Sequence, residues 1–333
     1  MSTNIKKILL INFGGLGDEI LFLPTIISLK KEFPNAEITL ALENRSKDIT
    51  SLTNLIDKTI TLNIKTTKYK KYFELLKLLF IIWRKRFDLV ISSGSNQFIS
   101  IFLFLTFIKK RYGYNTSKWS KFLLTKAITL NKNQYAAKMY HDLIRDITNI
   151  NTEFPAINIS RYITERNTIL IHPGVSLMSI KKGMIKTIPA QIWAEVILKL
   201  SNRGKKVLLV GGPDDKDVIQ YITNKVPNEK YINLFGKTKN LKELAELISK
   251  YEIFLCSDSA PLHIAVALQV KTFVIFGSTD DKKLIPQNGL VTPIKSISCT
   301  CPIRPCLWEK RSTTCDSLDC LNITSDEIVN TIL

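Results

Sequence analysis

The stretch that decides the fold reads KKVLLVGGPDD at residues 205–215 and IFLCSDSAPLH at residues 253–263. In each part an apolar run, typical of a strand buried inside a parallel sheet, ends in small residues and acids before a helical stretch. The carboxyl ends of parallel strands meet at one edge of a sheet, where open α/β folds bind ligands. Backbone amides in such turns suit phosphate groups, and carboxylates suit hydroxyl groups. The stretch therefore predicts a binding edge for a ligand that carries both.

The same alternation of strands and helices continues on either side and predicts an α/β fold with two doubly wound, Rossmann-like domains. The chain starts with a strand at residues 7–13, a glycine turn and a helix at residues 18–31 that Pro24 interrupts. A polar stretch near residues 151–166 separates the halves. We expect domains at residues 1–160 and 161–333 that face each other across a cleft. Further strands are expected at residues 37–42, 58–62, 87–92, 168–172, 206–210, 231–234, 253–256 and 272–276, and further helices at residues 72–84, 97–109, 134–150, 190–203, 214–225, 241–250 and 261–268.

The composition is that of a soluble globular protein that can bury a large core. The chain has 333 residues, of which 45% are hydrophobic and 23% are charged. No signal peptide is visible, and the longest apolar stretch, residues 98–108, is too short to span a bilayer. We therefore expect no transmembrane segment and a cytoplasmic location.

The net charge of +18 is concentrated in the first half of the chain. Residues 51–150 contain 18 Lys and Arg but only 5 Asp and Glu. Such a positive field attracts nucleic acid, an acidic lipid surface or a phosphorylated acceptor. A solvated basic face with no partner explains the same composition.

The turn Gly14-Gly15-Leu16-Gly17-Asp18 separates the first strand from the first helix. It matches neither the Walker A loop nor the dinucleotide fingerprint. One interpretation is a tight turn with Asp18 as a helix cap. In the other, the glycines let a substrate approach the backbone, and Asp18 acts as a general base on an acceptor hydroxyl.

In the second half, Ser257-Asp258-Ser259 precedes the helix expected near Pro261. The exposed amides of a helix start and the Ser259 hydroxyl form a seat for phosphate. A carboxylate beside a phosphate seat does not bind phosphate, so Asp258 is expected to bind sugar hydroxyls. The alternative is that Asp258 caps the helix. His263, in the first turn, is interpreted as a packed residue that supports the site.

Two other residues have two interpretations each. Lys186 is a solvated charge or, beside the turn His172-Pro173-Gly174 and Ser176, a phosphate ligand. Asp215 caps the helix beside it or accepts hydrogen bonds from a ribose diol. The spacing alone does not separate these interpretations.

The tail of the chain, residues 299–320, holds five of the six cysteines. Four of them have paired spacing and could bind a structural zinc or iron: Cys301, Cys306, Cys315 and Cys320. The alternative in a reducing compartment is free thiols. Arg304, Lys310 and Arg311 of this tail either meet an anionic substrate or form plain surface.

Taken together, these motifs resemble the family 9 glycosyltransferases, the ADP-heptose:lipopolysaccharide heptosyltransferases and their relatives. The resemblance covers nearly the whole chain, and the order and spacing of its motifs make it specific. The motifs are Gly17-Asp18, His172-Pro173-Gly174, Lys186-x-x-Pro189, Gly211-Gly212-Pro213-Asp214-Asp215, Gly236-Lys237-Thr238, Ser257-Asp258-Ser259-x-Pro261-x-His263 and Phe276-Gly277.

The resemblance implies a GT-B fold and an inverting transfer of a sugar, heptose above all, from an ADP-sugar bound by the second domain. The acceptor would be an anionic glycolipid such as the lipopolysaccharide inner core, at the inner-membrane surface, and catalysis would need no cofactor. Asp18 would be the base beside the acceptor-side turn of Gly14, Gly15 and Gly17, and Lys186 would stabilise the departing diphosphate. The implied donor contacts are Ser176 and Lys186 for the diphosphate, Asp215 for the ribose, Lys239 for the adenine, Asp258 for the sugar, and the helix start Ser259, Ala260, Pro261, Leu262 and His263.

Rival interpretations remain at this stage. A glycosyltransferase with a protein acceptor and a GT-B-like nucleotide-sugar epimerase would share the architecture and the phosphate seat. A basic nucleic-acid-binding protein would share the charge, but no aromatic and basic recognition motif is present, so nucleic acid is not an expected partner. A degenerate membrane-surface scaffold would not need the set of site residues.

Overall fold

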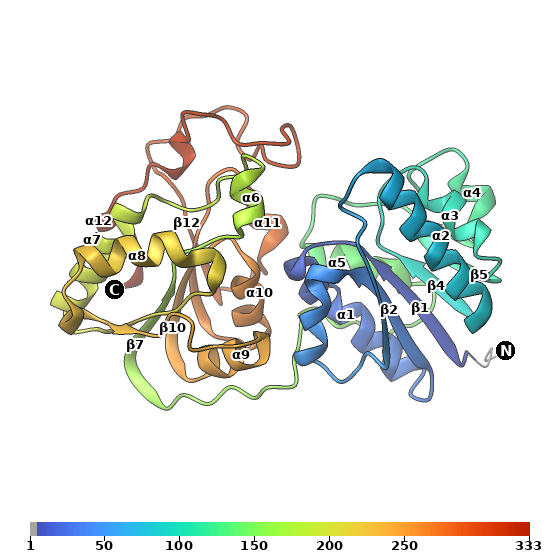
Figure 1. Ribbon diagram of the computed structural model, residues 1–333, viewed down its shortest axis with the longest axis horizontal. Coiled ribbons are helices and arrows are strands. Elements are labelled where there is room, and N and C mark those ends of the chain that lie inside the picture. Colours follow the sequence, from blue (N-terminus) through green and yellow to red (C-terminus); the bar gives the residue numbers. More distant parts are fainter. Residues whose placement is uncertain (1–4) are drawn as a thin grey trace. The chain divides into compact units, whose positions relative to one another are not determined.

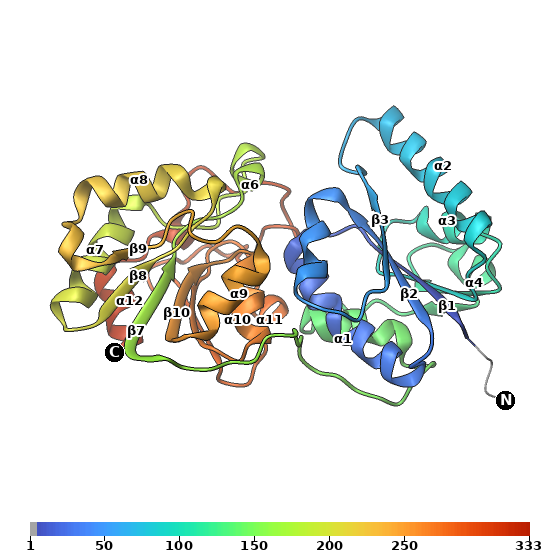
Figure 2. The ribbon, with the colours of Figure 1, turned by 60° about the horizontal axis from the view of Figure 1, so that its bottom comes forward.

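The computed structural model describes residues 5–333, which form two compact units, Met1–Asn158 and Ile159–Leu333. Each unit is a six-stranded parallel sheet with helices on both faces (Figures 1 and 2). The expected pair of doubly wound α/β domains is therefore confirmed.

The sheet of the first unit has the order β3-β2-β1-β4-β5-β6. The central strand β1 is buried on both faces, since Ile8, Leu9, Leu10 and Ile11 are at most 1% exposed. Helix α1 runs without a break through Pro24, so the expected interruption is wrong; its buried face packs closely enough to offset the lost backbone bond. The strands are β1 Lys7–Asn12, β2 Glu37–Glu43, β3 Lys58–Leu62, β4 Leu89–Ser92, β5 Lys110–Tyr114 and β6 Lys126–Ile128, and the helices are α1 Leu16–Glu32, α2 Lys68–Lys85, α3 Ile99–Leu105, α4 Ser120–Leu123 and α5 Ala136–His141.

The sheet of the second unit has the order β12-β11-β10-β7-β8-β9. Its core is built on Trp193, Phe254 and the aliphatic strand residues around them. The strands are β7 Glu165–His172, β8 Lys206–Leu209, β9 Ile232–Asn233, β10 Tyr251–Ser257, β11 Lys271–Ile275 and β12 Val291–Ile294, and the helices are α6 Leu177–Lys181, α7 Ala190–Asn202, α8 Lys216–Lys225, α9 Leu241–Ser249, α10 Ala260–Ala267, α11 Asp281–Leu284 and α12 Ser325–Ile332.

Each sheet has one point at which the order of strand addition reverses. In the first unit this point lies between β1 and β4, and in the second it lies between β7 and β10. Ligands of open α/β sheets bind beyond the carboxyl ends of the strands at this reversal. Asp18 lies in the first turn of α1, which follows β1, and Asp258 lies in the turn after β10, so both expected sites lie at such an edge.

Candidate active site

Asp18, in the first turn of α1, accepts a hydrogen bond on each of its carboxylate oxygens. Oδ2 accepts a hydrogen bond of 2.7 Å from the backbone N–H of Gly15, and Oδ1 accepts one of 3.1 Å from the hydroxyl of Tyr140 on α5. A Cβ added at Gly14 would lie 2.2 Å from the Cβ of Asp18, so only glycine fits there. Gly17 lies in the first turn of α1. The capping contact expected of Asp18 is thus present, and its second oxygen meets a tyrosine.

Tyr140 donates to Asp18 from a buried position. Burial, and then the charge of Asp18, raises the pKa of the Tyr140 hydroxyl well above its ordinary value. The hydroxyl therefore stays protonated and keeps donating to the carboxylate. This bond fixes the orientation of the Asp18 side chain.

Glu19, the next residue, is 1% exposed and lies beneath the turn. Its Oε2 accepts a hydrogen bond of 3.1 Å from Asn12 Nδ2, and its Oε1 has no hydrogen-bond partner. The hydroxyl of Ser93, just after β4, donates to Asn12 Oδ1 at 2.6 Å. Burial, and then the neighbouring Asp18 charge, raises the pKa of Glu19 well above its ordinary value. The network links the ends of β1 and β4 beneath Asp18.

In the second unit, Lys186 and Asp258 form a buried ion pair. The Lys186 Nζ lies 3.4 Å from Asp258 Oδ2 and donates a hydrogen bond of 2.7 Å to the Asp258 carbonyl oxygen. The side chains are only 11% and 4% exposed. Thr279 donates to the same Oδ2 at 2.9 Å, and the ring of Trp308 lies 5.1 Å from the Nζ. The interpretation of Lys186 as a solvated charge is therefore wrong.

Thr187, the residue after Lys186, ties three elements together. Its Oγ1 donates to the carbonyl of Pro173 after β7 at 2.7 Å and lies 2.7 Å from the Ser257 hydroxyl at the end of β10. The indole N–H of Trp193 on α7 donates to it at 3.1 Å. These bonds hold the backbone of Lys186 against the strand ends.

Asp215 is 5% exposed and belongs to the turn after β8. Its Oδ2 accepts a bond of 2.8 Å from the Gly212 N–H and lies 3.3 Å from His172 Nε2. A Cβ added at Gly174 would lie 1.7 Å from Asp215 Oδ1, so this glycine makes room for the carboxylate. The observed contacts are those of a helix cap. The ribose role remains a prediction.

The start of α10 offers fewer amides than expected. Pro261 has no N–H, and the N–H of Leu262 donates to the Ser259 carbonyl at 3.1 Å. The amides of Ser259 and Ala260 remain available, because the first residues of a helix have no partner within it. His263 is buried, at 5% exposed, in agreement with a packed residue.

Two further expected ligands lie at exposed positions. Ser176 is exposed and directly precedes α6, and the first N–H of that helix, from Leu177, donates to Asp214 Oδ2 at 3.1 Å. The N–H of Lys239 donates to Glu243 Oε2 at 2.8 Å, at the start of α9. A purine could meet the Lys239 backbone only through its carbonyl.

The tail of the chain supports the loops around this site through hydrogen bonds to their carbonyl groups. The Arg304 guanidinium donates to the carbonyls of Gly277 at 3.0 Å, Phe276 at 3.1 Å and Ser296 at 3.3 Å. Thr314 donates through its hydroxyl and its N–H, both at 2.8 Å, to the Gly183 carbonyl in the loop before Lys186. The tail therefore fixes both the turn after β11 and the lysine loop.

The expected metal site of Cys301, Cys306, Cys315 and Cys320 does not form. All six cysteines are free thiols, and within residues 5–333 no three His, Cys, Asp or Glu side chains are grouped so that they could hold a metal ion. Burial raises the pKa of Cys306 and brings that of Cys320 to about 11. These two thiols resist deprotonation, whereas the hydrogen bond with Ser317 lowers the pKa of Cys315.

The comparison with protein families decides what this arrangement belongs to. The model of glycosyltransferase family 9 (heptosyltransferase) matches residues 76–311, which include Tyr140 and the Lys186–Asp258 pair with its neighbours Thr279 and Trp308. The chain belongs to glycosyltransferase family 9. It is therefore a transferase, and the epimerase and nucleic-acid-binding interpretations are not supported.

Relatives of known function agree with this family. Lipooligosaccharide heptosyltransferase 2 of Campylobacter jejuni is 23% identical over 298 residues, covering 88% of this chain and 87% of the relative. Lipopolysaccharide heptosyltransferase 3 of Escherichia coli is 25% identical and covers 79% of this chain and 81% of the relative. Among solved structures, the ADP-heptose heptosyltransferase II of E. coli has a TM-score of 0.72 at 20% identity and covers 98% of this chain and 97% of that chain. This structural likeness confirms the GT-B fold.

Four neighbours of Asp18 and of the Lys186–Asp258 pair in the candidate site were not expected from the sequence. Tyr140 donates a hydrogen bond to Asp18, and Glu19 lies beneath Asp18. Thr279 donates a hydrogen bond to Asp258, and the Trp308 ring lies beside the Lys186 ammonium group. Glu19 had a usable signal, because an acid directly follows Asp18 within an apolar helix face. The other three come from distant segments and carry no local pattern.

Proposed function

We propose that the protein transfers heptose, with inversion, from ADP-heptose to a hydroxyl of an anionic glycolipid such as the lipopolysaccharide inner core. Its family membership and the names of its relatives support this reaction. The buried Lys186–Asp258 pair is the observation that carries it. A lysine held beside backbone amides at a strand edge suits a diphosphate that gains charge as it leaves.

The donor step breaks the bond between the anomeric carbon and the diphosphate oxygen, and ADP leaves with the electron pair. Lys186 stabilises the growing negative charge, helped by the amides of Ser259 and Ala260. The Lys186 ammonium group needs little reorganisation to reach the transition state, because Asp258 and the Trp308 ring already hold it in place. Fixed positive charge in a water-poor site is worth more than the same charge in bulk solvent.

The acceptor step forms a bond between an acceptor oxygen and the opposite face of the anomeric carbon. The hydroxyl proton passes to Asp18. Gly15 and Tyr140 hold the two oxygens of that carboxylate, and so aim it without removing its charge.

The proposed place of action is the cytoplasmic face of the inner membrane, where an ADP-linked donor and a lipid-linked acceptor can meet. Among the described residues, no helix has the length and apolarity needed to cross a bilayer. The attachment would therefore be peripheral.

The test is transfer from ADP-heptose by the variant Asp18→Asn. The proposal predicts a loss of about 100- to 10,000-fold in kcat with binding of ADP-heptose retained, because only proton removal is affected. The matched control is Asp48→Asn, an exposed acid of the same unit, which should transfer like wild type. Wild-type turnover by Asp18→Asn would refute the role of the base.

A further inference from the structure

The outer face of α2 exposes a continuous apolar stripe. Tyr69, Phe73, Leu76, Phe80 and Trp83 are 87%, 70%, 64%, 58% and 48% exposed. They follow one another at intervals of four, three, four and three residues, and at about 100° per residue they lie within an arc of about 80°. Leu78 and Ile82, on the opposite side of the helix, are buried in the core of the unit. The stripe therefore faces solvent and lies outside the core of the unit.

A basic stripe runs beside the apolar one. Lys70, Lys77 and Arg84 each follow a stripe residue directly, so they lie about 100° further round the helix. The whole of α2 carries six Lys and Arg and a single acid, Glu74. The Arg84 guanidinium also lies over the Phe80 ring, 5.7 Å from its centre. Apolar and cationic groups thus alternate across one exposed helix face.

The surface continues onto α3 and α4, which lie beside α2 in both views of the first unit (Figures 1 and 2). The Trp83 ring lies 6.2 Å from that of Phe107, and its indole N–H donates to the Leu105 carbonyl at 2.9 Å. Phe107, Trp119 and Phe122 are 71%, 59% and 80% exposed. We call the exposed sides of α2, α3 and α4, with the loop that follows α3, the α2–α4 face.

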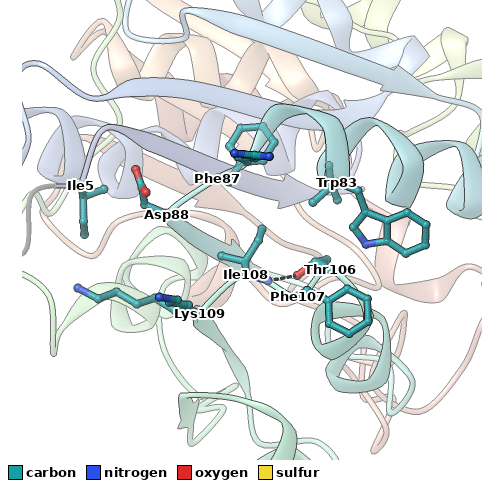
Figure 3. Close-up of a pocket in the computed structure, with 11 residues that line it drawn as sticks. Ile5, Trp83, Phe87, Asp88, Thr106, Phe107, Ile108 and Lys109 are labelled. Carbon is teal, nitrogen blue, oxygen red and sulfur yellow. Dashed lines mark hydrogen bonds between the residues drawn. The ribbon is translucent and has the colours of Figure 1, made fainter.

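A pocket of about 610 Å³ opens where this face meets the start of β5 (Figure 3). Trp83 and Phe107 form part of its wall, and Arg86 and Lys109 add positive charge. Its acid, Asp88, accepts bonds of 2.8 and 2.9 Å from the N–H groups of Lys6 and Lys7. The pocket therefore combines apolar walls with three cationic residues, Arg86, Lys109 and Lys110, and one carboxylate, a net positive lining that suits a phosphate headgroup with its first acyl carbons.

We propose that the α2–α4 face docks on the surface of an anionic lipid bilayer. Aromatic side chains partition to the bilayer interface, and Lys and Arg beside them are attracted by acidic headgroups. A second copy of the chain fits less well, because two such helices would bring their positive charges together. The membrane site stands on this surface alone, while its purpose, access to a lipid-linked acceptor, rests on the proposed function.

The experiment is vesicle sedimentation of the full chain with phosphatidylethanolamine vesicles that contain 30 mol% phosphatidylglycerol, compared with pure phosphatidylcholine. Wild type should bind the anionic vesicles, and the binding should weaken with salt. The triple variant Lys70→Gln, Lys77→Gln, Arg84→Gln should bind them on the order of 100-fold more weakly. The double variant Phe73→Ser, Phe80→Ser should also lose binding, because it removes the inserted rings while keeping the charge.

The matched control is Lys31→Gln, Lys47→Gln, Lys132→Gln, which removes the same charge from exposed positions outside the α2–α4 face. It should bind like wild type. Equal loss in this control, unchanged binding by the triple variant, or a wild-type dimer that the triple variant abolishes would overturn the proposal. Tighter binding to duplex DNA than to the vesicles would do the same.

Turnover with a deacylated, water-soluble acceptor separates this proposal from the proposed function. The α2–α4 face variants should keep that turnover, because none of them touches the reacting groups. If wild type binds vesicles but does not transfer heptose, the function fails and the membrane site stands. If it transfers heptose but ignores vesicles, the membrane site fails alone.

Discussion

Replacing Lys186 by methionine should destabilise the second unit strongly, because Asp258 would be left buried without its cation. The Nζ and Oδ2 atoms are 3.4 Å apart, and the side chains are 11% and 4% exposed. At an effective dielectric constant of about 20, Coulomb's law gives about 5 kcal/mol for this separation. Breaking one half of a buried pair costs about 3–5 kcal/mol, so the free energy of unfolding should fall by about that much.

Urea denaturation at pH 7 measures the change. The double variant Lys186→Met, Asp258→Asn should recover most of the stability, because it leaves no buried charge, but it should not recover heptose transfer. Lys295→Met is the matched control, because it breaks an ion pair with Asp281 in which the Lys295 side chain is 42% exposed. It should lower the free energy of unfolding by less than about 1 kcal/mol. If Lys186→Met unfolds like wild type, or no more easily than Lys295→Met, the buried pair does not exist as described.

Two further predictions concern the supports of the site. Burial raises the folded-state pKa of Glu19 above its unfolded value of about 4.3. Wild type therefore loses stability as the pH rises from the unfolded towards the folded pKa, by about 1.4 kcal/mol per unit of pKa difference. In Glu19→Gln, the free energy of unfolding should consequently exceed that of wild type at pH 8 and match it near pH 4. Urea denaturation across this pH range checks it, and parallel profiles for the two proteins would contradict the buried acid. Thr187→Val should lower the free energy of unfolding by about 1–3 kcal/mol, because the buried indole N–H of Trp193 loses its acceptor. Thr187→Ser keeps the hydroxyl and should lower it less. Equal losses in the two variants would show that the hydroxyl is not the cause.

Strands β7, β8, β10 and β11 of the second unit could be predicted because their sequence matches their burial, whereas β12 at Val291–Ile294 was not expected. The run around Leu255 is continuously apolar and lies inside the sheet, where β10 has neighbours on both sides. Strand β5 was not expected, because it starts with Lys110 and Arg111 and follows an apolar stretch that was assigned to a helix over residues 97–109. That helix ends earlier, at Leu105, and the stretch of residues 134–150 likewise holds only a short helix, α5. The sheet, and not local propensity, decides these boundaries.

The site was predictable where a residue follows its own strand and not where it arrives from elsewhere. Asp18 lies in the first turn of the helix after β1, and Asp258 directly follows β10, so topology alone places them at the edge. The pairing of Lys186 with Asp258 joins residues 72 positions apart, and Trp308 reaches the lysine from the tail. The cysteine spacing suggested a metal, but the tail is held by Arg304 and Thr314 through backbone carbonyls. Such contacts depend on the folded chain and leave no periodic signal.

The most direct test of the central claim is the mass of the acceptor after incubation with the protein and a set of ADP-, UDP- and GDP-linked sugars. The account predicts that a heptose-deficient lipopolysaccharide core gains one heptosyl residue from ADP-heptose, with release of ADP. Transfer from a UDP- or GDP-sugar instead, or consumption of ADP-heptose with no gain in acceptor mass, would contradict it.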